Sequence, residues 1–208
     1  MAQHLITLSK NNSKLQATQR DTGKRTHAFD LPAGKTCPQA GTCREICYAT
    51  RSERYPAVIA MRQRNLEAVK GLLNKGELPT NMAAELVRNK TAILRWHSSG
   101  DVFNLKYARA IIATAKLTPT VSHFVYTKNY KAWRLFKNAN LPNLQAVFSL
   151  GSKHDELALS DPEINVCKIK HPGDKATFSV LCNGTTDSHK ASDYYAIKNW
   201  QSFEIELH

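Results

Sequence analysis

The chain concentrates three of its five cysteines, Cys37, Cys43 and Cys47, in one short segment. Prolines and glycines interrupt residues 32–48, so we expect this segment to be a loop. Nothing in the first residues resembles a signal peptide, and a reducing cytosol keeps thiols out of disulfides. We therefore expect a cytoplasmic protein, located in the host cell if a phage encodes it, in which the three thiols form a metal or cluster site.

The cysteine spacing favours an iron–sulfur cluster over zinc. Five residues separate Cys37 from Cys43, and three separate Cys43 from Cys47. Structural zinc sites usually present closely spaced cysteine pairs. A 4Fe–4S cluster accepts irregular spacing, because its ligands come from one wide loop plus a distant cysteine. Zinc is the alternative, and basic residues around the loop either offset the charge of a thiolate-bound cluster or form a solvated rim.

The charge of the chain is its unusual compositional feature. The net charge is +12, and residues 1–75 hold 13 Lys and Arg against 5 Asp and Glu, so the half with the cysteine loop is the more basic. Such a surplus raises the expectation of a nucleic-acid partner, although it also serves solubility. No apolar run has the length needed to cross a membrane, so we expect no membrane partner.

The hydrophobic pattern alternates between strands and helices. It predicts strands at 26–31, 91–96, 121–126 and 144–150, with helices at 104–116 and 130–136 between the last three. This alternation predicts one α/β domain over residues 1–208 with a mostly parallel sheet. The C-terminal segment 164–208 is expected to add strands at 164–169, 176–181 and 203–207 and a helix at 188–200.

The remaining elements are expected before the second of these strands. Residues 4–9 alternate like a short edge strand, and a turn at 11–14 follows. A long amphipathic helix ends near Gly76, and its polar face carries Arg62 and Arg64, which contact water or phosphate. A shorter helix at 78–87 is expected to begin at a cap formed by Thr80 or Asn81.

Polar residues gather at the predicted strand ends, where parallel α/β folds place their sites. There the sequence has the cysteine loop, the segment from His97 to Asp101, the pair Tyr126 and Thr127, residues 149–151, and Cys182. Cys182 at the end of a strand is the favoured fourth cluster ligand. Cys167 in mid-strand is expected to be a buried small hydrophobe.

Each polar residue at the strand ends also has a purely structural explanation. His97 is either a catalytic candidate or a hydrogen-bonded loop residue, and Asp101 is either a catalytic candidate or the cap of the next helix. Ser98, Ser99 and Gly100 either offer backbone N–H groups to an anion or cofactor or form a tight turn. Their common location, together with Tyr126, favours a shared cofactor-binding site.

The cysteine loop and the later motifs together resemble a known family. The segment Leu31-Pro-Ala-Gly-Lys-Thr-Cys-Pro, the pair Cys43-x-x-x-Cys47-Tyr-Ala, and Arg95-Trp-His-Ser-Ser-Gly-Asp followed by Tyr126-Thr are similar to the gene product 88 family of phages and mobile elements. The resemblance runs from about residue 8 to residue 200. It implies a partial, incomplete βα barrel like the core of radical S-adenosylmethionine enzymes, with Cys37, Cys43 and Cys47 as cluster ligands and residues 97–101 as a site loop.

The spacing C-x5-C-x3-C differs from the C-x3-C-x2-C of standard radical enzymes, so the resemblance implies S-adenosylmethionine less strongly than the cluster. Three hypotheses follow. The first is a phage-type accessory protein that binds nucleic acid through a basic surface, with a structural or redox-sensing 4Fe–4S cluster. The second is a radical-enzyme-like protein with an open cluster iron, and the third is a zinc-stabilised binding module.

Overall fold

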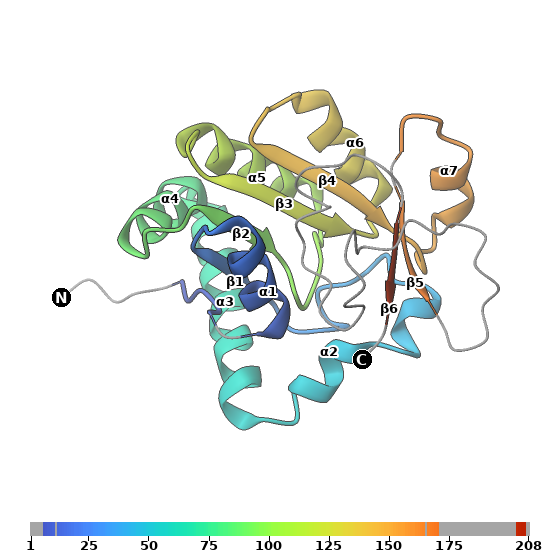
Figure 1. Cartoon of the computed structure of the whole chain (residues 1–208), viewed down its shortest axis with the longest axis horizontal. Coiled ribbons are helices and arrows are strands. Elements are labelled where there is room, and N and C mark those ends of the chain that lie inside the picture. Colours follow the sequence, from blue (N-terminus) through green and yellow to red (C-terminus); the bar gives the residue numbers. More distant parts are fainter. Residues whose placement is uncertain (1–5, 11, 165, 171–202, 207–208) are drawn as a thin grey trace.

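The structure, a computed structural model, describes residues 6–10, 12–164, 166–170 and 203–206 and contains one six-stranded sheet (Figure 1). Every neighbouring pair of strands is parallel, and the spatial order of the strands is their order in the sequence. The strands are β1 (Thr26–Phe29), β2 (Ile93–Trp96), β3 (Ser122–Thr127), β4 (Leu144–Ser149), β5 (Val166–Lys170) and β6 (Phe203–Glu206). The mixed α/β class with a parallel sheet is thus confirmed.

Helices connect the strands and precede the sheet. They are α1 (Ser13–Thr22), the short 3-10 turn η1 (Thr42–Arg44), α2 (Tyr48–Ser52), α3 (Pro56–Lys75), α4 (Leu78–Arg88), α5 (Leu105–Leu117), α6 (Tyr130–Ala139) and α7 (Asp155–Leu159). The expected helices between β2, β3 and β4 are confirmed as α5 and α6. Among the described residues, no helix has the length and apolar character needed to cross a membrane.

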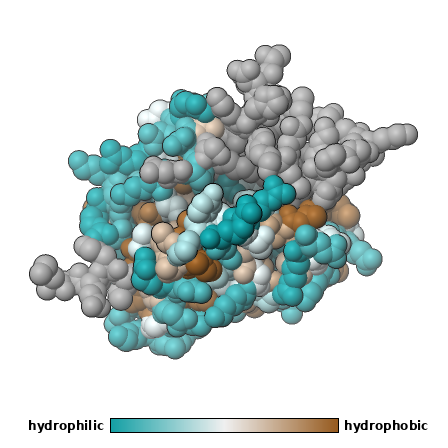
Figure 2. All heavy atoms as spheres, turned by 90° about the horizontal axis from the view of Figure 1, so that it is seen from below, coloured by the Kyte–Doolittle hydropathy of each residue, from teal (hydrophilic) through white to brown (hydrophobic). Residues whose placement is uncertain are grey.

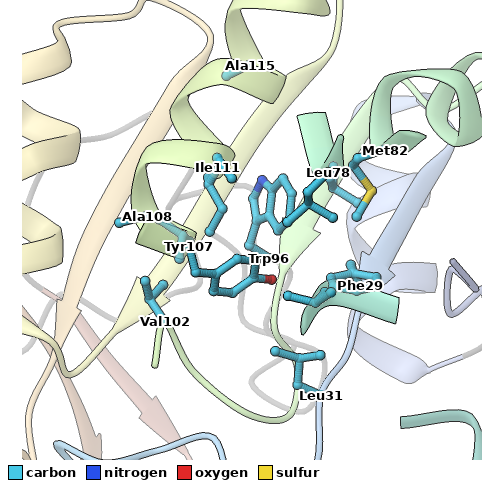
Figure 3. Packing of buried hydrophobic residues seen from close by; sticks show 14 of the residues in the cluster. Phe29, Leu31, Leu78, Met82, Trp96, Val102, Tyr107, Ala108, Ile111 and Ala115 are labelled. Atoms are coloured by element: carbon cyan, nitrogen blue, oxygen red, sulfur yellow. The ribbon is translucent and has the colours of Figure 1, made fainter. Parts of the chain in front are cut away.

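One face of the sheet carries the main core. Phe29, Trp96 and Val125 lie opposite one another in the register of β1, β2 and β3 and belong to one buried cluster with residues of α3 to α6. Trp96 lies at its centre between side chains of α4 and α5 (Figure 3). Leu78 and Met82 of α4 are fully buried, and each such side chain contributes about 1.5–3 kcal/mol to folding by leaving water.

The opposite face of the sheet carries the strand residues that alternate with those of the core face. Ala28, Arg95 and Phe124 are paired in register there, and all three are buried. The guanidinium carbon of Arg95 lies 5.0 Å from the ring centroid of Tyr126, a distance that permits a favourable cation–π contact. Arg95 and Tyr126 thus place a polar stack next to the strand ends that hold the site.

Several local predictions were wrong at the N-terminal side of the sheet. Of the expected strand 4–9, residues 6–9 are described and form only one antiparallel bridge, between Ser9 and Ala28. The expected turn at 11–14 runs instead into α1, because Asn12 caps this helix by accepting a hydrogen bond from the Leu15 N–H. Glu77, rather than Thr80 or Asn81, occupies the N-cap position of α4.

The long helix α3 ends at Gly76 as expected, but one of its arginines does not face solvent. Arg62 is buried and donates to the Glu53 carboxylate at 3.1 Å and to the Ala49 carbonyl at 3.2 Å, whereas Arg64 is exposed. Burial of the Arg62 charge is offset by this ion pair. Arg62 therefore anchors α2, which follows the cysteine loop, to α3.

In the C-terminal segment, the strand expected at 164–169 appears as β5 and the closing strand as β6. Cys167 is fully buried in β5, as expected. The strand at 176–181, the residue Cys182 and the helix at 188–200 lie outside the described residues.

Candidate functional site

The cysteine loop leaves the carboxyl end of β1 and is held by turns of its own. Gly34 adopts a left-handed backbone conformation with φ +66°, which glycine accepts without strain. The Gly34 carbonyl then accepts a hydrogen bond from the Cys37 N–H at 3.1 Å. Cys43 lies in η1, and Cys47 directly precedes α2. The three cysteines are therefore placed by a turn, a 3-10 helix and a helix start.

One side of the loop is fastened to the end of β4. The Gly151 carbonyl accepts hydrogen bonds from the N–H groups of Gly41, at 2.9 Å, and Cys43, at 3.2 Å. The Lys153 N–H donates to the Gln39 carbonyl at 2.9 Å. A Cβ on Gly41 or Gly151 would lie within 3.0–3.2 Å of the facing segment, so glycine at both positions permits this close approach.

The other side of the loop is fastened to the segment after β2. Asp30 accepts hydrogen bonds from the N–H groups of Ser98, at 2.6 Å, and Ser99, at 3.2 Å, while Leu31 N–H donates to the Ser99 carbonyl at 3.0 Å. The Tyr48 hydroxyl donates to the Ser98 carbonyl at 2.5 Å. The N–H groups of Ser98 and Ser99 therefore bind a carboxylate of the chain itself and are not available to an external anion.

Asp101 joins the loop after β2 to the end of β3. Its carboxylate accepts hydrogen bonds from the N–H of Val102 at 2.6 Å, the hydroxyl of Thr127 at 2.7 Å and the N–H of Lys128 at 2.9 Å. Asp101 does not cap the following helix, because Asn104 performs this function for α5. Burial raises the pKa of the Asp101 carboxyl, and these hydrogen bonds oppose the shift.

The cysteine loop and the segments to which it is hydrogen-bonded border a cavity of about 380 Å³ at the carboxyl ends of β1 to β4. This volume is typical of small-molecule sites. All three loop cysteines line the cavity. So do other residues expected at the site: His97, Ser98, Ser99, Gly100, Asp101 and Tyr126. The cavity wall also includes Arg44, Tyr48, Lys128 and Ser149. The tertiary structure thus brings together the loop cysteines, residues 97–101, Tyr126 and Ser149, whereas Thr127 and Gly151 do not line the cavity.

The thiols of Cys37 and Cys43 lie in an environment that favours their protonated form when no metal is bound. Burial, and next the nearby carboxylate of Asp101, raise the pKa of the Cys37 thiol to about 12. Burial also raises the pKa of the Cys43 thiol, and the charge of Lys128 opposes this shift. Reactive cysteines instead have lowered pKa values. This environment does not favour a nucleophilic cysteine.

His97 is held as a neutral imidazole. Its backbone is left-handed, with φ +69°, and its ring packs against Phe29, Trp96 and Tyr107. The Phe29 carbonyl lies 3.1 Å from Nδ1. Because a carbonyl only accepts, Nδ1 carries the proton. Burial lowers the pKa of His97 to about 3, so this residue is poorly matched to proton transfer near neutral pH.

Two further observations concern metal ligands. In the part of the chain that the structure describes, no group of three or more His, Cys, Asp and Glu side chains is placed to hold a metal ion. Cys182, the favoured fourth ligand, lies outside that part. Its role therefore stays a prediction.

Sequence reasoning did not single out Asp30 or Lys128, whereas Ser149 was among the strand-end residues expected at the site. Asp30 and Lys128 stand immediately after strands β1 and β3, and Ser149 ends β4. The rule that sites lie at carboxyl strand ends was the signal that pointed to them. Lys128 is the least expected, because its side chain is almost fully buried although lysine is usually exposed.

Fold and site together define an α/β protein with a parallel sheet and a cysteine-lined cavity at the carboxyl ends of its strands. Comparison with protein families is consistent with the sequence motifs. The family model described as Gene product 88 matches residues 6–199, so the chain belongs to the gene product 88 family. Searches of curated proteins and of solved structures found no match.

Proposed function

We propose that this protein binds a 4Fe–4S cluster through Cys37, Cys43 and Cys47. The observation that carries the proposal is that three thiols from three separate turns of one loop line the same cavity. Thiolates are the protein ligands of such clusters. The cavity volume of about 380 Å³ exceeds by roughly tenfold the ~30 Å³ share of one water molecule, so the site has room for a group much larger than a single ion.

The electrostatics of the cavity support a metal-bound state. Thiols with raised pKa values lose their protons when a cation supplies the missing positive charge. Lys128 and Arg44 line the same cavity and would offset the negative charge of a thiolate-bound cluster. When bound, the cluster would supply electron transfer or, at an iron without a protein ligand, a coordination site for a small molecule.

The sequential strand order supports a partial βα barrel like the radical-enzyme core. In that fold, strands follow one another around the sheet and ligands bind at their carboxyl ends. The six strands of this chain are arranged in such an order, with β1 and β6 at the two edges of the described sheet. In this proposal, Cys182 would approach the cysteine loop from the C-terminal segment and complete the cluster.

The proposed biological role is that of a phage-type accessory protein that binds nucleic acid in the host cytoplasm. Its basis is a group of exposed cations on and beside the cysteine loop, namely Lys35, Arg44, Arg51 and Arg54. In Figure 1, α2 lies on the lower side of the molecule, and Figure 2 shows that hydrophilic residues make up most of the described surface viewed from there. Cations so placed are suited to phosphate contacts.

Salt-dependent binding tests this role. The double variant Arg51→Ala/Arg54→Ala is expected to weaken binding to labelled single- and double-stranded nucleic acid. It is also expected to reduce the slope of log K against log salt concentration by about 2, because each lost phosphate contact removes about one unit of slope. The matched control is Lys116→Ala/Lys137→Ala. These exposed lysines lie in the last turns of α5 and α6, which lead to the amino ends of β3 and β4, whereas the cysteine loop lies at the carboxyl ends of the strands. Binding that is insensitive to salt, or equal loss in both double variants, would contradict the proposed surface.

Anaerobic purification with iron, sulfide and zinc analysis tests the cluster itself. The expected result is a brown protein with about four irons and four sulfides per chain. A colourless protein with one zinc per chain would contradict the cluster and support the zinc-stabilised binding module instead.

The cavity favours a second candidate, an enzyme with an open cluster iron. It extends from the thiols to His97, Asp101 and Tyr126, which leaves space for S-adenosylmethionine or another substrate beside the cluster. The variant Cys182→Ala separates the two candidates. Loss of the cluster is expected if Cys182 closes it, as in the binding protein, whereas retained iron and a spectrum that changes on addition of S-adenosylmethionine would favour the enzyme.

A further inference from the structure

Lys128 has a buried side chain whose position is fixed by the ends of three strands. Only 7% of the residue is exposed. Its backbone N–H donates to Asp101 at the end of β2, as described above. Its ammonium group donates to the Ser149 carbonyl at 3.2 Å, the Ser149 hydroxyl at 2.7 Å and the Leu150 carbonyl at 2.7 Å. The ammonium is therefore held rigidly at the wall of the cysteine cavity.

The charge of this ammonium is not matched by an ion pair within the described residues. Its three oxygen acceptors are neutral, and no carboxylate of the described chain lies within ion-pair distance of the Nζ atom. The charge of Lys128 does act on the Asp101 carboxyl, whose pKa it lowers against the effect of burial, but no salt bridge of the described residues joins the two. A buried charge without an ion-pair partner costs free energy. An anionic group bound in the cavity would therefore stabilise the folded protein by compensating the charge of Lys128.

The charge of Lys128 acts on the thiol of Cys43, whose pKa it lowers against the effect of burial. Lys128 lies within hydrogen-bonding reach of Cys43, and both residues line the cavity. Cys43 is in turn fastened to Gly151, two residues beyond Ser149. The positive charge, the thiol and the β4 end thus belong to one wall of the cavity.

We infer that Lys128 is the residue that compensates the charge of the bound cluster and thereby raises its reduction potential and its retention. The inference rests on the proposed function and extends it to one named residue. Reduction adds an electron, and so a negative charge, to an already anionic thiolate-bound cluster. A fixed cation a few ångströms away stabilises the reduced form more than the oxidised form.

The test is the reduction potential of the loaded full-length protein and three variants, measured anaerobically by a spectroscopic titration. Lys128→Met removes the charge, Lys128→Gln removes it but keeps a hydrogen-bond donor for the β4 carbonyls, and Lys128→Arg keeps it. The two neutral variants are expected to shift the potential downward, with the reduction equilibrium constant lowered about tenfold, or about 59 mV for one electron. Lys128→Arg is expected to remain near the wild type.

Lys153→Met is the matched control. Lys153 is close in sequence and donates from Nζ to the Pro38 carbonyl of the same cysteine loop at 3.1 Å, but it is exposed and does not line the cavity. Its charge is screened by water, so no shift is expected.

The outcomes separate the inference from the proposed function. A wild-type protein that binds no iron overturns both. If the wild type is loaded but the reduction potentials of Lys128→Met and Lys128→Gln equal that of the wild type, only the role of Lys128 is overturned. The same conclusion follows if Lys128→Arg shifts the potential as much as the neutral variants do, because side-chain shape rather than charge would then matter. If the neutral variants fold, as circular dichroism would show, but lose the cluster while Lys128→Arg keeps it, the inference is supported through retention.

Discussion

Single replacement of Cys37, Cys43 or Cys47 by alanine is expected to abolish cluster loading and to reduce bound iron and sulfide at least about tenfold. Each thiolate is proposed to bind one iron, so its loss leaves that iron without a protein ligand. All three side chains line the same cavity, and none of them is needed to fill the main core. Metal analysis and the visible spectrum of anaerobically purified variants measure the effect.

Cys167→Ala is the matched control for these variants. Cys167 is the fourth cysteine of the described residues, but it is fully buried in β5 and does not line the cavity. Its replacement is expected to leave iron content unchanged and to cost stability, because a buried sulfur is lost from a packed position. Equal loss of iron in Cys167→Ala and in the three loop variants would contradict the assignment of the loop cysteines as ligands.

The loop variants are expected to stay folded without metal. The three loop cysteines are only partly buried, and the loop is fastened by backbone hydrogen bonds to Gly151 and by Asp30 to the segment after β2. Circular dichroism and the unfolding midpoint of the metal-free proteins check this expectation. Iron loss with an unchanged fold would then identify a ligand effect rather than a folding defect.

Gly100→Ala is expected to lower the free energy of unfolding by about 2–5 kcal/mol. Gly100 has φ +84°, where a side chain costs about 1–2 kcal/mol. A Cβ at this position would lie 2.6 Å from the Thr36 hydroxyl oxygen and 2.7 Å from the Leu31 Cβ. Such overpacking adds about 1–3 kcal/mol. Urea unfolding of the metal-free protein measures the sum.

Gly34→Ala separates the clash from the backbone strain. Gly34 also has a positive φ, +66°, and lies in the cysteine loop, but a Cβ there meets nothing within 4 Å. Only the strain remains, so a cost of about 1–2 kcal/mol is expected. Equal destabilisation by the two substitutions would show that the segment after β2 is not packed against Leu31 and Thr36 as described.

The effect of Gly100→Ala is also expected to reach the cavity. Relief of the clash requires the segment after β2 to move away from the cysteine loop, which would lengthen the contact between the Ser99 carbonyl and the Leu31 N–H, now 3.0 Å. Iron content of the variant should therefore fall along with its stability. Gly34→Ala should retain more iron, since its Cβ points to open space.

The hydrophobic pattern predicted the elements that bury one side of the sheet. β2, β3 and β4 and the helices α5 and α6 follow from runs of apolar residues with strand or helix periodicity, and the core confirms them. Helix α1 was missed because its sequence is mostly polar. Its caps, Asn12 and Gly23, are local, but the burial of Leu15 and Ala17 depends on tertiary packing.

The sequence predicted which residues lie at the site, but not which of them are free to bind a ligand and which hold the loops in place. The rule of strand ends gathered Cys37, His97, Asp101 and Tyr126, and all of them line the cavity. Asp101 and Ser98 proved to be engaged in hydrogen bonds that hold the loops, which the sequence does not show. Whether a polar group is free or already bonded depends on neighbours distant in the chain.

By itself, the sequence determined the α/β class, the parallel sheet and the clustering of three thiols in one loop, because periodicity, turn residues and spacing are local properties. The tertiary structure alone decided which groups complete the cavity. Lys128 is buried there because the end of β4 supplies its acceptors, and the N–H groups after β2 are occupied because Asp30 reaches them. These are contacts across more than twenty residues, which only the packing of strands side by side creates.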